Sequence, residues 1–392
     1  MLYVVGIILF IFSCLLFVSL ITEKIIFAPW NVTLIVWILV LLMYILVHQQ
    51  LYSLSMNFVI CLVLWVFPFT FTSFFVYKIT PPYSKPEWVP YEKHVNIITL
   101  IALFLVPFAV VKAIQHALIL GSPDSLIATL REQAITPEEN QLGIVKYFIY
   151  VINVLLMTEV NRRNIRKKRL AITIILCILF FVATMAKLTL SIYLFSALYL
   201  LYSNKKISLK PIAITILGLV ALIPALFLLR GSDSSGEVDI MSILLTYSVA
   251  SIIAFDYITP ASSVLWGGTT FRPLYHILSI LGYNYNLPQT LQDFVFVPMI
   301  TNVYTIMFPF YQDFGKEGVL VFSMILGAIL GYIYKKAQTG FTILKYIYAY
   351  IFSLLILQFF DELILQGISS ILQIVIVLLF CHVKFVFNKK EF

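Results

Sequence analysis

The sequence predicts an all-α polytopic integral membrane protein, and three observations support this. Hydrophobic residues make up 61% of the 392-residue chain and charged residues only 11%, whereas a soluble domain carries roughly 25% charged residues. Apolar runs long enough to cross a bilayer as helices recur along the chain. These runs do not alternate in polarity, as the strands of a membrane β-barrel would. A bundle of transmembrane helices is therefore expected.

About eleven apolar runs, within a range of 10–12, are expected to span the bilayer. They are Leu2–Ile21, Trp30–Val47, Met56–Tyr77, Val95–Gln115, Ile144–Val160, Leu170–Ala183, Leu188–Tyr202, Pro211–Leu229, Val319–Tyr334, Lys345–Phe360 and Ile368–Phe387. The predicted organisation is a bundle of eight spans over 1–229, a large extracytoplasmic loop over 230–318 and three last spans over 319–392. A smaller extracytoplasmic loop is expected over 116–143.

The distribution of Lys and Arg predicts the orientation in the membrane. The stretch 161–169, NRRNIRKKR, carries six basic residues and no acid, so the positive-inside rule places it in the cytoplasm. Alternating outward from it puts most of the other basic residues on the same side. The N-terminus is then expected to be extracytoplasmic and the C-terminus cytoplasmic. The net charge of +8 follows from this rule, and no nucleic-acid partner is expected.

Two stretches leave alternatives open. Residues 170–202 are expected to form two short spans with a break at 183–187, ATMAK, which places Lys187 below the outer interface. A single tilted span is the alternative, but it would put two basic stretches on opposite faces of the membrane. A further span within Ile240–Ile258 is the other alternative, although it would upset the charge distribution.

The extracytoplasmic segments are expected to contain helices of their own. Ser122-Pro123-Asp124 is typical of a helix start, with Pro at the first helical position. Ile240–Ile258 and Phe271–Leu281 are apolar stretches interrupted by polar residues, which indicates amphipathic helices on the outer membrane surface or capping the bundle. The four cysteines show no CxxC or Cys/His pattern, so neither a disulfide framework nor a metal site is predicted.

The apolar pattern breaks most sharply at Thr301–Gly318, TNVYTIMFPFYQDFGKEG, where polar, aromatic and turn-forming residues gather. Upstream of it lie a short hairpin with Lys187 at its tip, a span ending in Arg230-Gly231, a helix with Tyr247 and Asp256, and Gly268-Thr269-Thr270-Phe271. Together with these features, the block resembles the Wzy-type oligosaccharide repeat-unit polymerases of bacterial inner membranes, and it is the most specific part of the resemblance. Many relatives would carry Arg at the hairpin tip, whereas this chain has Lys187.

The resemblance implies a GT-C-like helical fold and a glycosyltransferase reaction. A growing glycan would pass from undecaprenyl pyrophosphate to the next lipid-linked repeat unit, with no nucleotide sugar, metal or other cofactor. The implied partners are the undecaprenyl-pyrophosphate-linked oligosaccharide and the bilayer, together with a chain-length regulator and a flippase.

Such a reaction needs cations for the leaving pyrophosphate. The candidates are Arg230, Arg272, Lys187 and Arg131, because cations are scarce on the extracytoplasmic side. Arg binds a pyrophosphate in a bidentate manner, and Arg272 shares one helical face with His276 if Phe271–Leu281 is helical. The alternative roles are anchoring of a helix end for Arg230 and Lys187, a solvated face for Arg272, and a pair with Glu132 for Arg131.

The acceptor hydroxyl needs a base, and the glycan needs an aromatic groove. His276, Asp256 and Asp313 are the candidate bases; the alternatives are a turn residue for Asp256 and an acid at a helix N-terminus for Asp313. Tyr304 and Tyr311, with Asn302 between aromatic residues, are the candidate glycan contacts, and the resemblance adds Tyr247. Most aromatic residues here would otherwise belong to an interfacial belt. Asp361-Glu362 is interpreted as a tight turn with helix-flanking acids.

Two other functions stay open. An O-antigen ligase shares this layout but transfers the finished glycan to a lipid A core. A flippase or exporter of lipid-linked units would carry no chemistry. It ranks third, because the chain shows no internal repeat and its polar residues concentrate outside the membrane.

Overall fold

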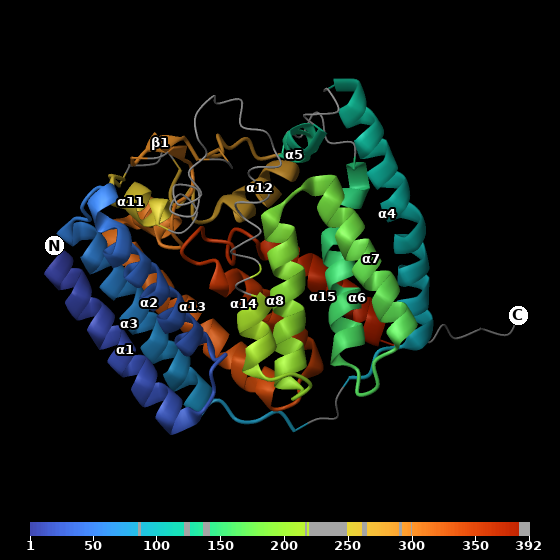
Figure 1. The fold of residues 1–392 in the computed structure, drawn as a ribbon, viewed down its shortest axis with the longest axis horizontal. Helices are drawn as coiled ribbons and strands as arrows, with labels where there is room; N and C mark the ends of the chain where they lie inside the picture. The colour runs from blue at the N-terminus through green and yellow to red at the C-terminus, as the bar shows by residue number, and fades with distance from the viewer. Residues whose placement is uncertain are drawn as a thin grey trace, which may run out of the picture. The chain divides into compact units, whose positions relative to one another are not determined.

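A computed structural model describes residues 1–84, 88–120, 126–135, 142–215, 218, 249–260, 265–289, 292–298 and 300–383. It is a helical membrane protein, with long apolar helices shown in Figure 1. The chain forms two compact units. Unit 1 comprises Met1–Tyr83, Val238–Thr339 and Ile351–Ser369, and unit 2 comprises Ser84–Glu237, Gly340–Tyr350 and Ser370–Phe392. Each unit is therefore built from segments that are distant in sequence.

Unit 1 is a bundle of long apolar helices with short elements at one end. Its long helices are α1 (Leu2–Glu23), α2 (Pro29–Val47), α3 (Met56–Ile79) and α13 (Phe308–Gln338). Its short elements are η1 (His48–Gln50), α11 (Ala250–Asp256), α12 (Arg272–Ile280) and the antiparallel pair β1 (Val295–Phe296) and β2 (Ile300–Thr301). The last residues of α14 (Thr342–Ile356) also belong to this unit.

Unit 2 is built mainly on four helices that contact one another. They are α4 (Glu92–Leu120), α6 (Phe148–Asn161), α7 (Lys167–Thr184) and α8 (Lys187–Ser203). The short helices α5 (Leu126–Ile135) and η3 (Gly143–Tyr147) pack beside them. Most of α14 and of α15 (Ile368–His382) completes the unit.

Six helices of the described residues are long and apolar enough to cross a membrane, and α8, α14 and α15 are shorter apolar helices. Each predicted span is helical over most of its described residues, although α14 ends at Ile356, before the predicted end at Phe360. Most of Pro211–Leu229 and the end of Ile368–Phe387 lie outside the described residues. The predicted break at 183–187 is confirmed: α7 ends at Thr184, Met185 adopts a left-handed conformation with φ 45°, and α8 begins at Lys187. The total of eleven spans stays a prediction.

Glycines bring α13 and α3 into close contact. A Cβ on Gly327 would collide with Thr72 and Phe69 of α3, and one on Gly331 would collide with the carbonyl group of Ser73. Small residues four apart allow two helix backbones to approach in a membrane, where apolar burial adds no driving force between helices. The GAILG sequence of α13 is therefore a packing motif.

A buried polar network secures the end of α14 within unit 1. The Gln358 side chain accepts hydrogen bonds from the indole nitrogens of Trp37, at 3.0 Å, and Trp65, at 3.3 Å. The backbone carbonyl of Gln358 accepts from the Ile306 amide at 2.8 Å. Buried indole N–H groups need such partners, so Gln358 joins α2, α3 and the segment before α13.

Helix ends that the Lys and Arg distribution puts on one side of the membrane do contact each other within each unit. In unit 1, Lys78 pairs with Glu23 and Lys336 donates to the carbonyl of Pro81. At the other end of the unit, Asn57 donates to the Tyr311 hydroxyl at 2.8 Å. These contacts agree with the prediction of which loops share a side of the membrane. Which side is cytoplasmic is predicted from the sequence alone.

Unit 2 shows the same agreement. Glu92, at the start of α4, pairs with Arg162, Arg166 and Arg169. The Lys345 amine donates to the side chain of Asn204 at 2.6 Å. All of these residues lie in segments that the sequence predicts to be cytoplasmic.

One predicted boundary needs correction, and one of two predicted arrangements is observed. The span expected to begin at Val319 belongs to a helix that begins at Phe308, because its first part, before a kink at Gly315, is helical as well. The described part of Ile240–Ile258 is α11, which is buried from Ala250 to Phe255 and so does not lie on the membrane surface. It contacts α3, as an element that caps the bundle does. The helix start predicted at Ser122-Pro123 lies outside the described residues.

Candidate functional site

The polar elements of unit 1 gather at the end of the bundle where α3 and α13 begin. We call this set the loop layer. It comprises 249–260, 265–289, 292–298, 300–307, the first turns of α13 and the turn 357–367. Figure 1 shows α11, α12 and β1 at this end of the bundle. The loop layer contains every unit 1 residue that the sequence predicts as a site residue and that the structure describes.

Asp313 connects the first turns of α13 to the turn at residues 268–270. Its carboxylate accepts hydrogen bonds from the backbone amides of Thr269, at 3.3 Å, and Thr270, at 2.6 Å. The Thr270 hydroxyl, which is buried, donates to the carbonyl of Pro309 at 3.0 Å. Asp313 lies within α13 rather than before it, so it holds the 268–270 turn instead of serving its own helix N-terminus.

Glycine permits this arrangement at one point in particular. Gly315 adopts φ 63° and ψ −149° inside α13, a conformation that side chains with a Cβ rarely take. The kink separates the turns that carry Tyr311 and Asp313 from the long apolar part of the helix. The polar turns can therefore face the loop layer while the remainder packs against α3.

The turn between α14 and α15 meets the same 268–270 segment. The Gln366 side-chain amide donates to the carbonyl of Thr269. Glu362 is buried, and its carboxylate accepts from the amides of Ile364, Leu365 and Gln366. Glu362 thus fixes the backbone of the turn that presents Gln366.

Asp361 stands beside this cap. It is half-buried, and its carboxylate accepts from the amide of Glu362 at 2.8 Å. Burial raises the pKa of Asp361 to about 7, and the neighbouring Glu362 carboxylate acts in the same direction. A carboxyl that titrates near neutral pH is suited to general acid–base chemistry. Its position in a turn outside the helices makes it a candidate base.

The helix α12 follows the 268–270 turn and is strongly amphipathic. Arg272, His276 and Ser279 recur at helical spacing on one face, whereas Leu274, Ile277 and Leu281 recur on the other and are exposed. The prediction of a helix that places Arg272 and His276 on one face is confirmed. An exposed apolar face is typical of a helix that lies in a membrane interface.

Arg272 is held in position at the start of α12. Its Nε donates to the carbonyl of Pro288 at 2.9 Å. Burial lowers the pKa of Arg272 from its ordinary value, but a guanidinium stays protonated at neutral pH. His276 lies further along the helix and is exposed. The helix therefore offers one anchored cation and one accessible imidazole.

Asp256, at the end of α11, has a structural partner. Its carboxylate accepts from both the amide and the hydroxyl of Ser55, each at 2.5 Å. The Ser55 side chain in turn accepts from the amides of Asn57 and Phe58 and so caps α3. This geometry favours the structural interpretation of Asp256 over a role as a base.

The candidate glycan contacts are largely enclosed. Tyr304 is 6% exposed and Tyr311 is 5% exposed. The Tyr304 hydroxyl donates to the carbonyl of Asp293 at 3.2 Å, and the Tyr311 hydroxyl accepts from Asn57. Asn302 is half-buried. These residues build the support of the loop layer, and their contact with a glycan stays a prediction.

For the remaining predicted site residues, membership of this group stays a prediction. Arg230 and Tyr247 lie outside the described residues. Lys187 and Arg131 belong to unit 2, which is described by itself. The Lys187 amine is buried where α8 begins, and Arg131 is half-buried in α5. The expected grouping of Lys187, Arg230 and Arg272 therefore stays a prediction as well.

Sequence reasoning missed Gln366 and gave Asp361 no chemical role. The signal for Asp361 was its acidic neighbour Glu362 in an otherwise apolar stretch without nearby basic residues. In the structure the two acids differ in role. Glu362 is the expected helix-flanking acid and accepts from the amides that follow it, whereas Asp361 accepts only from the amide of Glu362 among the hydrogen bonds described here. Gln366 gives no signal in sequence, because its partner lies far away in the chain.

Comparison of the chain with models of known protein families, with curated proteins and with solved structures finds no match. Among the described residues, no three His, Cys, Asp or Glu side chains gather in a way that could hold a metal ion.

Proposed function

We propose that the chain is a Wzy-type polymerase that joins lipid-linked oligosaccharide repeat units at the extracytoplasmic face of a bacterial inner membrane. The observation that carries the proposal is α12: it is attached to the membrane bundle through the 268–270 turn and Asp313, and it offers Arg272 and His276 opposite an exposed apolar face. A membrane-interface helix with a cation suits a substrate with a pyrophosphate on a lipid chain.

In the proposed reaction, the bond between the anomeric carbon of the growing glycan and its pyrophosphate oxygen breaks. A hydroxyl at the non-reducing end of the next lipid-linked unit forms the new glycosidic bond, and its proton passes to a base. Arg272 would stabilise the charge that develops on the leaving pyrophosphate. Arg230, Lys187 and Arg131 are the further cations that the sequence nominates for the same task.

Two groups of the loop layer are candidates for the base. His276 is accessible on α12, and imidazole is the most frequent general base in enzymes. Asp361 has its pKa raised to about 7 by burial, which suits proton transfer at neutral pH. Asp256 is the weaker candidate, since its carboxylate is bound to Ser55.

The polymerase, the ligase and the flippase predict different products. Purified protein in detergent should convert synthetic undecaprenyl-pyrophosphate-linked repeat units into a ladder of longer glycans. Transfer of glycan only when a lipid A core acceptor is added would instead favour a ligase. The absence of any glycan transfer, under conditions where a known polymerase elongates the same substrate, would refute the proposal.

A further inference from the structure

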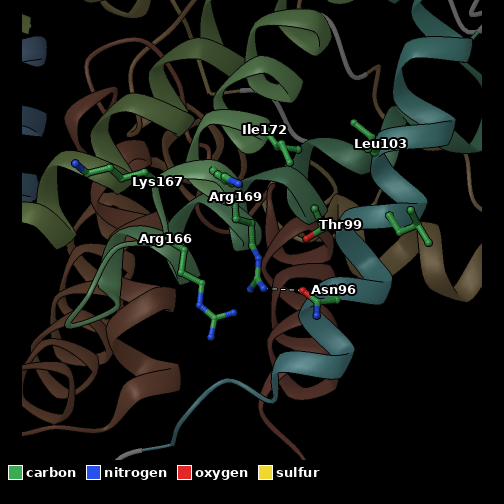
Figure 2. A pocket seen from close by; sticks show the side chains of 9 residues that line it. Asn96, Thr99, Leu103, Arg166, Lys167, Arg169 and Ile172 are labelled. Atoms are coloured by element: carbon green, nitrogen blue, oxygen red, sulfur yellow. Dashed lines mark hydrogen bonds between the residues drawn. The ribbon is translucent and has the colours of Figure 1, made fainter.

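A groove with a strongly basic end lies between α4 and α7 of unit 2. It has a volume of about 590 Å³. Its basic side chains are Arg166, Lys167, Lys168 and Arg169, and its apolar side chains are Leu100, Leu103 and Ile172. Figure 2 shows Asn96, Arg166 and Arg169 at one end of it and Leu103 and Ile172 further along the two helices.

The charge at the basic end is only partly compensated. Glu92 pairs with Arg162, Arg166 and Arg169, and the fully buried Glu159 pairs with Arg162 and Arg169. In these described ion pairs, two carboxylates serve three guanidinium groups, while Lys167 and Lys168 lie exposed beside them. The groove therefore carries excess positive charge.

The ion pairs also order the groove. The Arg169 side chain is 11% exposed, and it donates to Glu92, Glu159 and Asn96. The Arg166 side chain is 50% exposed, although it pairs with Glu92. Arg169 is thus held in a fixed position in the groove. Arg166 and the two lysines are exposed and can bind an added anion, and because Arg169 is already ordered, binding costs little conformational entropy there.

The other end of the groove opens onto an apolar surface. Leu100 and Leu103 of α4 are 56% and 43% exposed, and Ile174 and Ile175 of α7 are exposed as well. In a helical membrane protein, such a surface between the candidate span α4 and the span predicted from sequence within α7 is expected to contact acyl chains. A free anion would use only the basic end, whereas a lipid with an anionic headgroup would use both.

We propose that this groove binds an anionic phospholipid, with its phosphodiester headgroup on Arg166, Lys167 and Lys168 and its acyl chains along Leu100, Leu103 and Ile172. The basic stretch that the positive-inside rule places in the cytoplasm then faces the anionic lipids of the inner leaflet. The site is distinct from the loop layer and takes no part in the proposed transfer reaction.

Native mass spectrometry of the full chain in detergent, titrated with phosphatidylglycerol, tests this site. The chain should retain phosphatidylglycerol in preference to phosphatidylcholine with the same acyl chains. The double variant Lys167→Gln, Lys168→Gln should weaken retention by about tenfold or more, since basic residues near a membrane surface attract anionic headgroups. Both lysines are exposed, so this variant should fold normally.

The matched control is the double variant Lys205→Gln, Lys210→Gln, which removes the same charge from exposed positions outside the groove lining. It should leave retention of phosphatidylglycerol within about twofold of the wild type, because only charges near the headgroup contribute. Equal retention of the two lipids, or equal losses in the two double variants, would overturn the proposal. Full competition by glycerol phosphate would overturn it too, since it would show an anion site that needs no acyl chains.

Discussion

The carboxylate of Asp313 holds the backbone amide of Thr270 at 2.6 Å. Together with the hydrogen bonds from the Thr269 amide to Asp313 and from the Thr270 hydroxyl to Pro309, this hydrogen bond connects the first turns of α13 to the turn that begins α12, and therefore to Arg272 and His276. A side chain on a transmembrane helix thus determines where the amphipathic helix of the loop layer starts. Asp313 is best described as a positioning residue in the proposed site.

Replacing Asp313 with Ala should impair elongation strongly while the protein is still made. The variant leaves the Thr269 and Thr270 amides without their acceptor, and a displacement of catalytic groups by about 1 Å costs roughly 100-fold in rate. Asp313→Asn keeps one acceptor oxygen and should be intermediate. The rate of ladder formation measures the effect. Glu317→Gln removes an exposed carboxylate of the same helix and should be close to wild type; equal losses in both variants would contradict this role.

Replacing Gly331 with Ala should destabilise unit 1. The added Cβ would meet the backbone of Ser73, which cannot move without shifting α3, and overpacking of this kind costs about 1 to 3 kcal/mol. Thermal unfolding in detergent measures the change. Gly6→Ala is the control, because nothing lies within 4 Å of a Cβ at that position of α1, and alanine favours a helix. A Gly331→Ala variant as stable as Gly6→Ala would contradict the close packing.

Asp361→Asn should change how stability depends on pH. The pKa of Asp361 is raised from 3.8 to about 7 in the folded protein, so the folded state binds a proton that the unfolded state has lost between these values. Stability therefore falls as pH rises from about 4 to about 7. The variant mimics the neutral acid and should be the more stable protein at pH 8 but not at pH 4. The measurement is the unfolding temperature of the wild type and of Asp361→Asn between pH 4 and pH 8. Unfolding temperatures that change with pH in the same way in both proteins would argue against a buried titrating carboxyl at Asp361.

The pH dependence of elongation distinguishes the two candidate bases. If Asp361 accepts the proton, the rate should rise through about pH 7, and Asp361→Asn should abolish most of the activity. His276→Ala should then keep the pH profile of the wild type. The opposite pattern, with the profile lost in His276→Ala and kept in Asp361→Asn, would assign proton transfer to His276.

Much of the helical architecture follows from local properties of the sequence. Apolar runs predict helices because the backbone must satisfy its own hydrogen bonds in lipid, and Lys or Arg clusters predict which helix ends lie together. The contact between Lys78 and Glu23 and that between Lys345 and Asn204 agree with this. Even the break at Met185 is predicted, because a single span over 170–202 would put two basic stretches on opposite faces of the membrane.

The site was less accessible to sequence reasoning, because its contacts join residues that are far apart in the chain. Asp313 binds the turn at Thr270, and Gln366 reaches back to Thr269 from the turn after α14. No local pattern indicates such pairs. The helical character of Phe308–Phe314 was hidden for another reason: proline, aromatic residues and glycine there are typical of loops, yet the segment is held by Thr270 and Asn57.

The central claim is that this chain elongates lipid-linked glycans with the help of a cation on α12. The most direct test is the rate of ladder formation from synthetic lipid-linked repeat units by the wild type and by Arg272→Ala and Arg272→Lys. The wild type should give products spaced by one repeat unit, Arg272→Ala should lose about 100-fold or more of the rate, and Arg272→Lys should recover little because bidentate binding is lost. A wild type that forms no ladder, or an Arg272→Ala variant with a normal one, would contradict the account.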